Sequence, residues 1–203
     1  METSCQIGNV IIPARKGSTR LRGKNKAIIW GKPSIEWVIN SCFTARLVNR
    51  VIVASDDEDI LKIAQDCGAE IYVRTKDIDN NTSKLIACRH ILEHSSDTEL
   101  LNSPLALVQA NSPDISPGDI DTAILACQEG DRLESISMDT NFNQIGAIRA
   151  FWRPSHLWTA HLSYKAKFFE VTCSDIHTQE DLDALEKRGL PSYLRGATPP
   201  TSG

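Results

Sequence analysis

Short apolar runs rich in β-branched residues alternate with amphipathic helical segments over most of the chain. This alternation predicts an α/β fold with a mostly parallel sheet, because parallel strands need long crossover connections and helices usually supply them. The predicted strands are residues 7–12, 50–55, 70–73 and 105–110, and the predicted helices are residues 34–47, 57–68, 83–94 and 116–127. The strand at 105–110 is almost entirely apolar, as expected for a strand buried on both faces.

The pattern is looser after residue 130. It predicts strands at 135–138, 145–152 and 167–173 and a helix at 178–189. No internal repeat or Pro/Gly-rich linker divides the chain, and its 203 residues are enough for one hydrophobic core. We therefore predict a single domain over residues 1–194, followed by a disordered tail at 195–203.

Charge and composition exclude several classes of partner. The formal net charge is -4 and the pI is about 5.7, so bulk charge does not favour nucleic acid or an anionic membrane as a partner. No apolar run approaches the ~20 residues that span a bilayer, and residues 1–9 lack the apolar stretch of a signal peptide. The six cysteines form no CxxC pair, which predicts reduced, buried cysteines in a cytoplasmic protein.

A strongly basic loop follows the first predicted strand. Six cations fall within residues 15–26, with Gly17 and Gly23 among them. Ligands of α/β sheets bind at the carboxyl ends of the strands, where this loop is expected. Arginine and lysine complement phosphates, and a glycine lets the backbone approach a ligand closely. The loop matches neither a Walker A motif nor GxGxxG, so the pattern predicts a phosphate site of another kind, with a solvated surface loop as the simpler alternative.

The order of residues around this loop is distinctive. A Pro-Ala-Arg turn, a Gly-Ser pair, a Lys-Asn pair and a Gly-Lys-Pro turn occur in sequence, at Pro13–Arg15, Gly17–Ser18, Lys24–Asn25 and Gly31–Pro33. In this order they resemble the opening of the CMP-sugar synthetases, the cytidylyltransferases that activate sialic acids, related nonulosonic acids and Kdo. Later segments resemble the same family in the same order, from about residue 7 to residue 188. They are Ser55–Asp56, Arg74, the polar turn 80–83, the segment from Gln109 to Pro113, and residues 174–186.

The resemblance implies a Rossmann-like nucleotidyltransferase fold and a homodimer. It also implies attack of a sugar-acid hydroxyl on the α-phosphate of CTP, with Mg2+ as cofactor and release of pyrophosphate. By resemblance, the triphosphate is held by Arg15, Lys24 and Asn25, with Pro13, Gly17 and Ser18 in the same loop. The cytosine and ribose lie near Ala14, Arg74 and Ser83, and Gln109 faces the acceptor. Arg15, Lys24 and Asp175 are the expected catalytic residues, and Asp175 holds the metal.

Simpler interpretations exist for several of these residues. Ser83 also suits a helix N-cap, Arg74 a solvated strand end, and Asp175 a cap before the last helix. Gln109 lies within an apolar strand, where an amide satisfied within the core is the simpler alternative.

The metal motif departs from the family pattern. The family has two aspartates spaced one residue apart, and this chain has Asp175 and His177. Alternation on an extended segment predicts that both side chains point to one side. Because Mg2+ binds imidazole poorly, His177 could shift the site toward Mn2+, act as a base for the acceptor hydroxyl, or mark lost activity.

The acceptor region departs as well. Sialic acid enzymes carry Arg-Pro-Asn-Gly before an Ala-Ile strand, and here the stretch is Asn143 to Gly146. Asn143 takes the position of the arginine that binds the sugar acid, so a carboxylate would need Arg149 or Arg153 instead. The nucleotide half is thus better supported than the acceptor half. A non-sugar acid such as a phosphonate is the alternative acceptor, a nucleotide-binding relative with weakened catalysis is the alternative function, and a dinucleotide-binding oxidoreductase is a weaker third.

Overall fold

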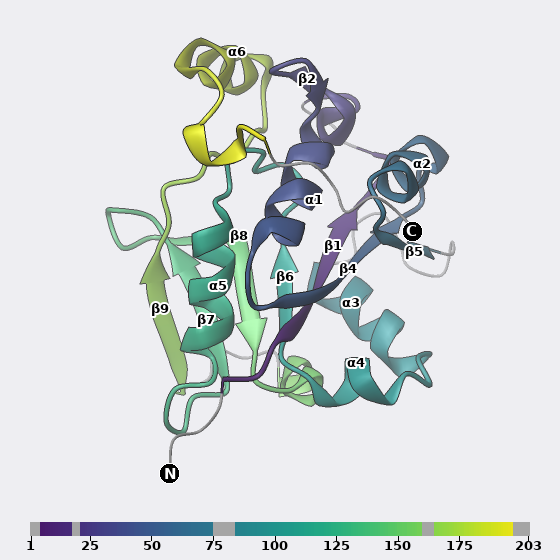
Figure 1. Ribbon diagram of the computed structural model, residues 1–203, viewed down its shortest axis with the longest axis vertical. Coiled ribbons are helices and arrows are strands. Elements are labelled where there is room, and N and C mark those ends of the chain that lie inside the picture. Colours follow the sequence, from purple (N-terminus) through teal and green to yellow (C-terminus); the bar gives the residue numbers. More distant parts are fainter. Residues whose placement is uncertain (1–4, 18–20, 75–83, 160–164, 197–203) are drawn as a thin grey trace.

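A computed structural model describes residues 5–17, 21–74, 84–159 and 165–196. Its centre is a sheet of seven strands in the order β5-β4-β1-β6-β8-β7-β9 (Figure 1). The strands are β1 (Gly8–Ala14), β4 (Val48–Ser55), β5 (Glu70–Val73), β6 (Leu105–Val108), β7 (Glu134–Met138), β8 (Gln144–Phe151) and β9 (Ala166–Glu170). Among these seven, only β8 runs antiparallel to its neighbours, so the predicted mostly parallel α/β sheet is confirmed.

Helices cover both faces of the sheet. One face packs against α1 (Ser34–Thr44), α2 (Glu58–Asp66) and α5 (Pro117–Ala126), and its core includes Val10 and Ile12 of β1. The other face packs against α3 (Lys84–Glu93), α4 (Thr98–Asn102) and the 3-10 helix η2 (Pro154–Thr159), and its core includes Ile11. Successive residues of β1 therefore enter opposite cores, as the alternation of side chains along a strand requires.

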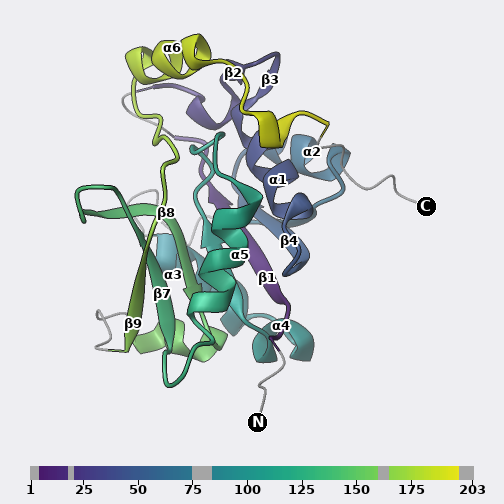
Figure 2. The same ribbon diagram turned by 60° about the vertical axis from the view of Figure 1, so that its left-hand side comes forward.

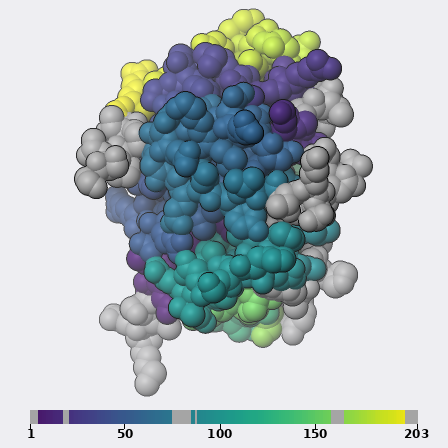
Figure 3. All heavy atoms as spheres, turned by 90° about the vertical axis from the view of Figure 1, so that its right-hand side faces the viewer, coloured from purple at the N-terminus to yellow at the C-terminus, as the bar shows by residue number. Residues whose placement is uncertain are grey.

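A third apolar cluster lies beyond the carboxyl ends of the parallel strands. It joins α6 (Gln179–Arg188) and η3 (Ser192–Leu194) to Trp37 of α1 and to the hairpin of β2 (Ile28–Ile29) and β3 (Lys32–Pro33), which follows the 3-10 helix η1 (Lys24–Lys26). Figure 2 shows α6 beside this hairpin, and Figure 3 shows the two at one end of the molecule. The hairpin turns through Trp30 and Gly31, both at positive φ, and the Trp30 amide donates to Glu186 of α6 at 2.9 Å. The cluster thus ties the first loop to the last helix.

Most predicted elements form within a few residues of their expected bounds. The expected caps are present: Ser116 and Thr178 each accept a hydrogen bond from the third residue of their helix in a capping box. The sequence analysis missed the β2–β3 hairpin, α4 and η2, which are short and carry little periodic signal. The predicted tail lies mostly outside the described residues. None of the described helices is long and apolar enough to cross a bilayer.

The cysteines are free, as predicted, but they are not all buried. Cys42, Cys67, Cys88 and Cys127 are buried, whereas Cys5 is exposed and Cys173 is half-buried. The prediction of burial is therefore wrong for Cys5, which lies before the first strand and packs into no core. Burial raises the pKa of the Cys67 thiol to about 11, so this thiol stays protonated and unreactive at neutral pH.

Candidate active site

The basic loop begins at the carboxyl end of β1, and hydrogen bonds to its backbone hold its described residues in place. The Lys16 amide donates to the Asp56 carboxylate at 2.7 Å, at the end of β4. The buried Asn25 side chain donates to the Arg15 carbonyl at 3.5 Å, and the Ser34 hydroxyl donates to the Lys24 carbonyl at 2.8 Å. The side chain of Arg15 is exposed at this edge. These contacts hold the described parts of the loop, residues 15–17 and 21–26, through their backbone.

One cation of the loop is neutralised by the protein itself. Lys26 forms ion pairs with Asp57 and Asp59, at the start of α2, at 2.9 and 2.7 Å. The bonded carboxylates raise the pKa of Lys26, and the Lys26 ammonium lowers the pKa of Asp59. Lys26 therefore anchors the loop to α2, and its charge is already balanced within the fold.

A second group of polar side chains surrounds Asp175 at the same edge. The amides of Gln109 and Asn111, just after β6, both donate to Oδ1 of Asp175. Nε2 of His177 lies 3.0 Å from Oδ2 of the same carboxylate. The structure thus brings Gln109, which the sequence analysis assigned to the acceptor, together with Asp175 and His177 of the metal motif. Asn111 was missed, although its position two residues after Gln109 would place both amides on one side of an extended segment.

The segment that carries Asp175 is firmly held. Ile176 is fully buried in the third cluster, and its amide donates to the Asn111 carbonyl at 3.0 Å. The amides of His177 and Thr178 donate to the Asp181 carboxylate at 2.9 and 2.8 Å, which lowers the pKa of Asp181. Because Ile176 points inward, Asp175 and His177 point to the same outer side, as predicted.

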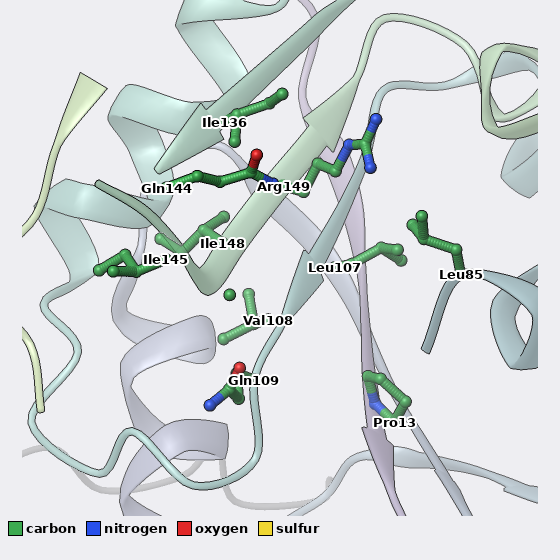
Figure 4. Close-up of a pocket in the computed structure, with 11 residues that line it drawn as sticks. Pro13, Leu85, Leu107, Val108, Gln109, Ile136, Gln144, Ile145, Ile148 and Arg149 are labelled. Atoms are coloured by element: carbon green, nitrogen blue, oxygen red, sulfur yellow. The ribbon is translucent and has the colours of Figure 1, made fainter. Parts of the chain in front are cut away.

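A small cavity lies beside Gln109. It has a volume of about 150 Å³ and lies between β1, β6, β7, β8 and α3 (Figure 4). Gln109 and Pro13 line it on the side of the loop, and Arg149 lines it on β8. Arg149 donates from Nε and Nη2 to one oxygen of the Glu134 carboxylate, at 2.8 and 2.5 Å. Only 16% of the Arg149 side chain and 4% of the Glu134 side chain are exposed, so this is a nearly buried ion pair.

A family model described as cytidylyltransferase matches residues 9–189. The chain belongs to this family. Two curated relatives are the 3-deoxy-manno-octulosonate cytidylyltransferases of Pseudomonas fluorescens and Geobacter sulfurreducens, 38% and 32% identical over 55% and 71% of this chain. These alignments cover 42% and 54% of the relatives, so the chain spans about half of their length.

Solved cytidylyltransferases share the fold. CMP:2-keto-3-deoxy-manno-octonic acid synthetase complexed with CTP aligns with a TM-score of 0.73 and 17% identity, over 90% of this chain and 98% of that chain. A cytidylyltransferase from Leptospira borgpetersenii aligns with a TM-score of 0.67 and 17% identity, over 92% of this chain and 88% of that chain. At such identities the comparison establishes the nucleotidyltransferase fold, and the resemblance to CMP-sugar synthetases is confirmed by the family match.

Three other residues that the resemblance names lie on β1, after β5 and on the β7–β8 hairpin. Ala14 is buried at the end of β1, and the Arg74 amide, after β5, donates to the Ser55 carbonyl at 2.8 Å. Asn143 is exposed on the β7–β8 hairpin, where its side chain donates to Asp139 at 3.0 Å, and it does not line the cavity beside Gln109. Ser18 and Ser83 lie outside the described residues.

The two arginines offered as substitutes for the missing acceptor arginine lie in different places in the structure. Arg149 lines the cavity but is paired with Glu134. Arg153 follows the carboxyl end of β8, near the amino ends of the antiparallel neighbours β6 and β7, and donates to Gln6 at 3.1 Å. The structure therefore places Arg153 away from the cavity, whereas compensation by Arg149 stays a prediction.

The donor set at Asp175 fits a divalent cation that is held mainly by phosphates. The described residues contain no group of three or more His, Cys, Asp or Glu side chains that could hold a metal. Mg2+ is often bound through one or two carboxylates together with substrate phosphates and water. Asp175, 40% exposed, supplies one such carboxylate, while the neighbouring imidazole of His177 suits transition metals better.

Proposed function

We propose that the protein is a CTP-dependent cytidylyltransferase that transfers CMP to an acceptor hydroxyl and releases pyrophosphate. The observation that carries this proposal is the meeting of the basic loop and the Asp175 cluster at one sheet edge in a chain of the cytidylyltransferase family. In the reaction, the acceptor oxygen bonds to the α-phosphorus, the bond to the β-phosphate oxygen breaks, and the hydroxyl proton leaves to solvent or a base.

The proposed roles follow from charge and position. Arg15 and Lys24 stabilise negative charge on the triphosphate as it passes to pyrophosphate, since phosphoryl transfer depends on positioning and charge neutralisation. Asn25 holds the Arg15 backbone in place, and Gly17 and Ser18 continue the same loop. Ala14, Arg74 and Ser83 are the proposed contacts of cytosine and ribose, by resemblance.

Asp175, with His177 beside it, is the proposed protein ligand of Mg2+ or Mn2+. When bound, the cation would neutralise charge on the phosphates. Gln109 and Asn111 orient the Asp175 carboxylate, because both amides donate to one of its oxygens. A homodimer is a proposal from the same resemblance, and a cytoplasmic location is a proposal from the free cysteines.

A sugar acid is the first acceptor class to test, because the curated relatives carry the name of a 3-deoxy-manno-octulosonate enzyme. The test is pyrophosphate release from CTP with 3-deoxy-manno-octulosonate, N-acetylneuraminate and non-sugar hydroxy acids, each with Mg2+ or Mn2+. Acceptor-dependent release that is selective for CTP over UTP, ATP and GTP supports the proposal. No release with any acceptor, from protein that binds no CTP, would contradict it.

One observation favours a second candidate, a relative that binds the nucleotide but turns over slowly. His177 replaces an aspartate of the family motif and engages the second oxygen of Asp175. The variant His177→Asp distinguishes the two candidates. If it gains Mg2+-dependent pyrophosphate release that the unaltered protein lacks, the weakened relative is correct. If the unaltered protein already turns over with Mg2+ as fast as the variant, the second candidate is excluded.

A further inference from the structure

We propose that the acceptor carries a compact apolar group, which occupies the cavity beside Gln109. This inference rests on the proposed function, because it names the acceptor class of the same site. The cavity connects the two halves of that site. Pro13 lines it where the basic loop begins, and Gln109 lines it while its amide touches Asp175. An acceptor with its hydroxyl near Gln109 and Asp175 would place its body in this cavity.

The lining of the cavity is mostly aliphatic. Its walls include Leu85 of α3, Leu107 of β6, Ile136 of β7, and Ile145 and Ile148 of β8 (Figure 4). A volume of about 150 Å³ is close to that of a dry cavity in another protein that binds benzene. The space therefore suits a ring or a branched chain of about six carbon atoms. A polyhydroxylated chain placed here would lose most of its hydrogen bonds to water, because only Gln109, Gln144 and Arg149 among the described lining side chains are polar.

The charged residues of the cavity also favour an apolar occupant. Arg149 is the only Lys or Arg side chain among the cavity-lining residues that the structure describes, and Glu134 already neutralises it. Breaking a nearly buried ion pair in order to bind an acceptor carboxylate would leave Glu134 uncompensated, which is costly. An acidic group on the acceptor is therefore expected to face the open side near Gln109, with the apolar group directed toward Leu107 and Ile136.

Binding of small probes tests this inference directly. The probes are mandelate and 2-hydroxy-4-methylpentanoate, each a hydroxy acid with an apolar group, and gluconate and 3-deoxy-manno-octulosonate, which are polyhydroxylated. Dissociation constants are measured by titration NMR on the full chain, with and without CTP and Mg2+. We expect at least one apolar probe to bind roughly tenfold more tightly than both polyols. The inference would be overturned if either polyol bound more tightly than both apolar probes. It would also be overturned if neither apolar probe bound at millimolar concentrations.

Two variants show whether the cavity is the site. Leu85 and Leu101 are both partly buried against the same core cluster, but only Leu85 lines the cavity. Leu85→Gln should weaken the apolar probe roughly tenfold, and Leu101→Gln, the matched control, should leave it unchanged. Equal probe affinity in the two variants would overturn the inference. The rise in melting temperature with CTP, measured on the same samples, tests the proposed function separately. If an apolar probe bound but CTP caused no rise, the cavity would be supported as a binding site and the proposed cytidylyltransferase activity would be contradicted.

Discussion

The basic loop after β1 and the cavity beside Gln109, the proposed nucleotide and acceptor sites, differ in how their arginine side chains are placed and paired. On the proposed nucleotide side, backbone contacts hold the described residues of the loop after β1, and Arg15 is exposed. On the acceptor side, Arg149 is nearly buried and bonded to Glu134. The difference teaches that a count of cations says little about what a site binds. The loop can meet a triphosphate, whereas the cavity beside Gln109 presents a neutral, mainly apolar surface.

The largest expected effect is on the nucleotide side. Arg15→Ala should lower the turnover of CTP by about 10³-fold, because a positioned cation opposite the developing phosphate charge is worth several kcal/mol. The melting temperature should stay nearly constant, since the Arg15 side chain is exposed. Pyrophosphate release measures the first effect and thermal unfolding the second. Lys62→Ala, on the exposed face of α2, is the control with near-normal turnover, and an equally active Arg15→Ala protein would refute the role given to the loop.

The next effect is on the acceptor side and concerns stability. Glu134→Gln should lower the free energy of unfolding by about 3 kcal/mol, because it leaves Arg149 charged and nearly buried without its partner. Urea unfolding at neutral pH measures this loss. The control is Glu36→Gln, which breaks the more exposed pair with Lys32 and should cost less than about 1 kcal/mol. Similar losses of unfolding free energy in the two variants would show that burial of the Arg149–Glu134 pair adds nothing to its contribution.

A smaller effect is expected where the two sides meet. Asn111→Ala should cost about 2 kcal/mol of unfolding free energy, because the buried Ile176 carbonyl loses the Asn111 amide donor at 2.7 Å. It should also reduce turnover about tenfold or more while leaving CTP binding intact, since Asp175 loses one of its two amide donors. Unfolding and steady-state kinetics separate the two effects. A loss of stability with unchanged turnover would limit Asn111 to a structural role.

The smallest effect depends on pH. The amides of His177 and Thr178 lower the pKa of Asp181 in the folded protein, so its contribution exists above the unfolded pKa of about 3.9 and is lost as the pH falls through the lower folded value. Asp181→Ala should therefore cost about 1 kcal/mol at pH 7 and progressively less as the pH falls below the unfolded pKa of about 3.9. Unfolding curves across this range, compared with Asp183→Ala on the same helix, measure it. A cost that does not change with pH would contradict this assignment.

Local signals explain why much of the fold was predictable. The β-branched runs, the helical spacing and the caps at Ser116 and Thr178 each depend on residues close together in the sequence. They can therefore be recognised from a single sequence. The Arg149–Glu134 pair could not be predicted, because it depends on the register by which β7 and β8 pair. The turn at Trp30 was missed for a similar reason: its amide is bonded to Glu186, far along the chain. The cavity beside Gln109 therefore depends on contacts between residues far apart in the sequence, and there the sequence analysis predicted least.

The most direct test of the central claim is the melting temperature of the protein with CTP, UTP, ATP, GTP or NAD, each with and without Mg2+ or Mn2+. A ligand that binds only the folded state must raise the melting temperature. The proposed function predicts a metal-dependent rise with CTP that exceeds the rise with every other nucleotide. No rise with CTP, or an equal rise with ATP and GTP, would contradict a cytidylyltransferase.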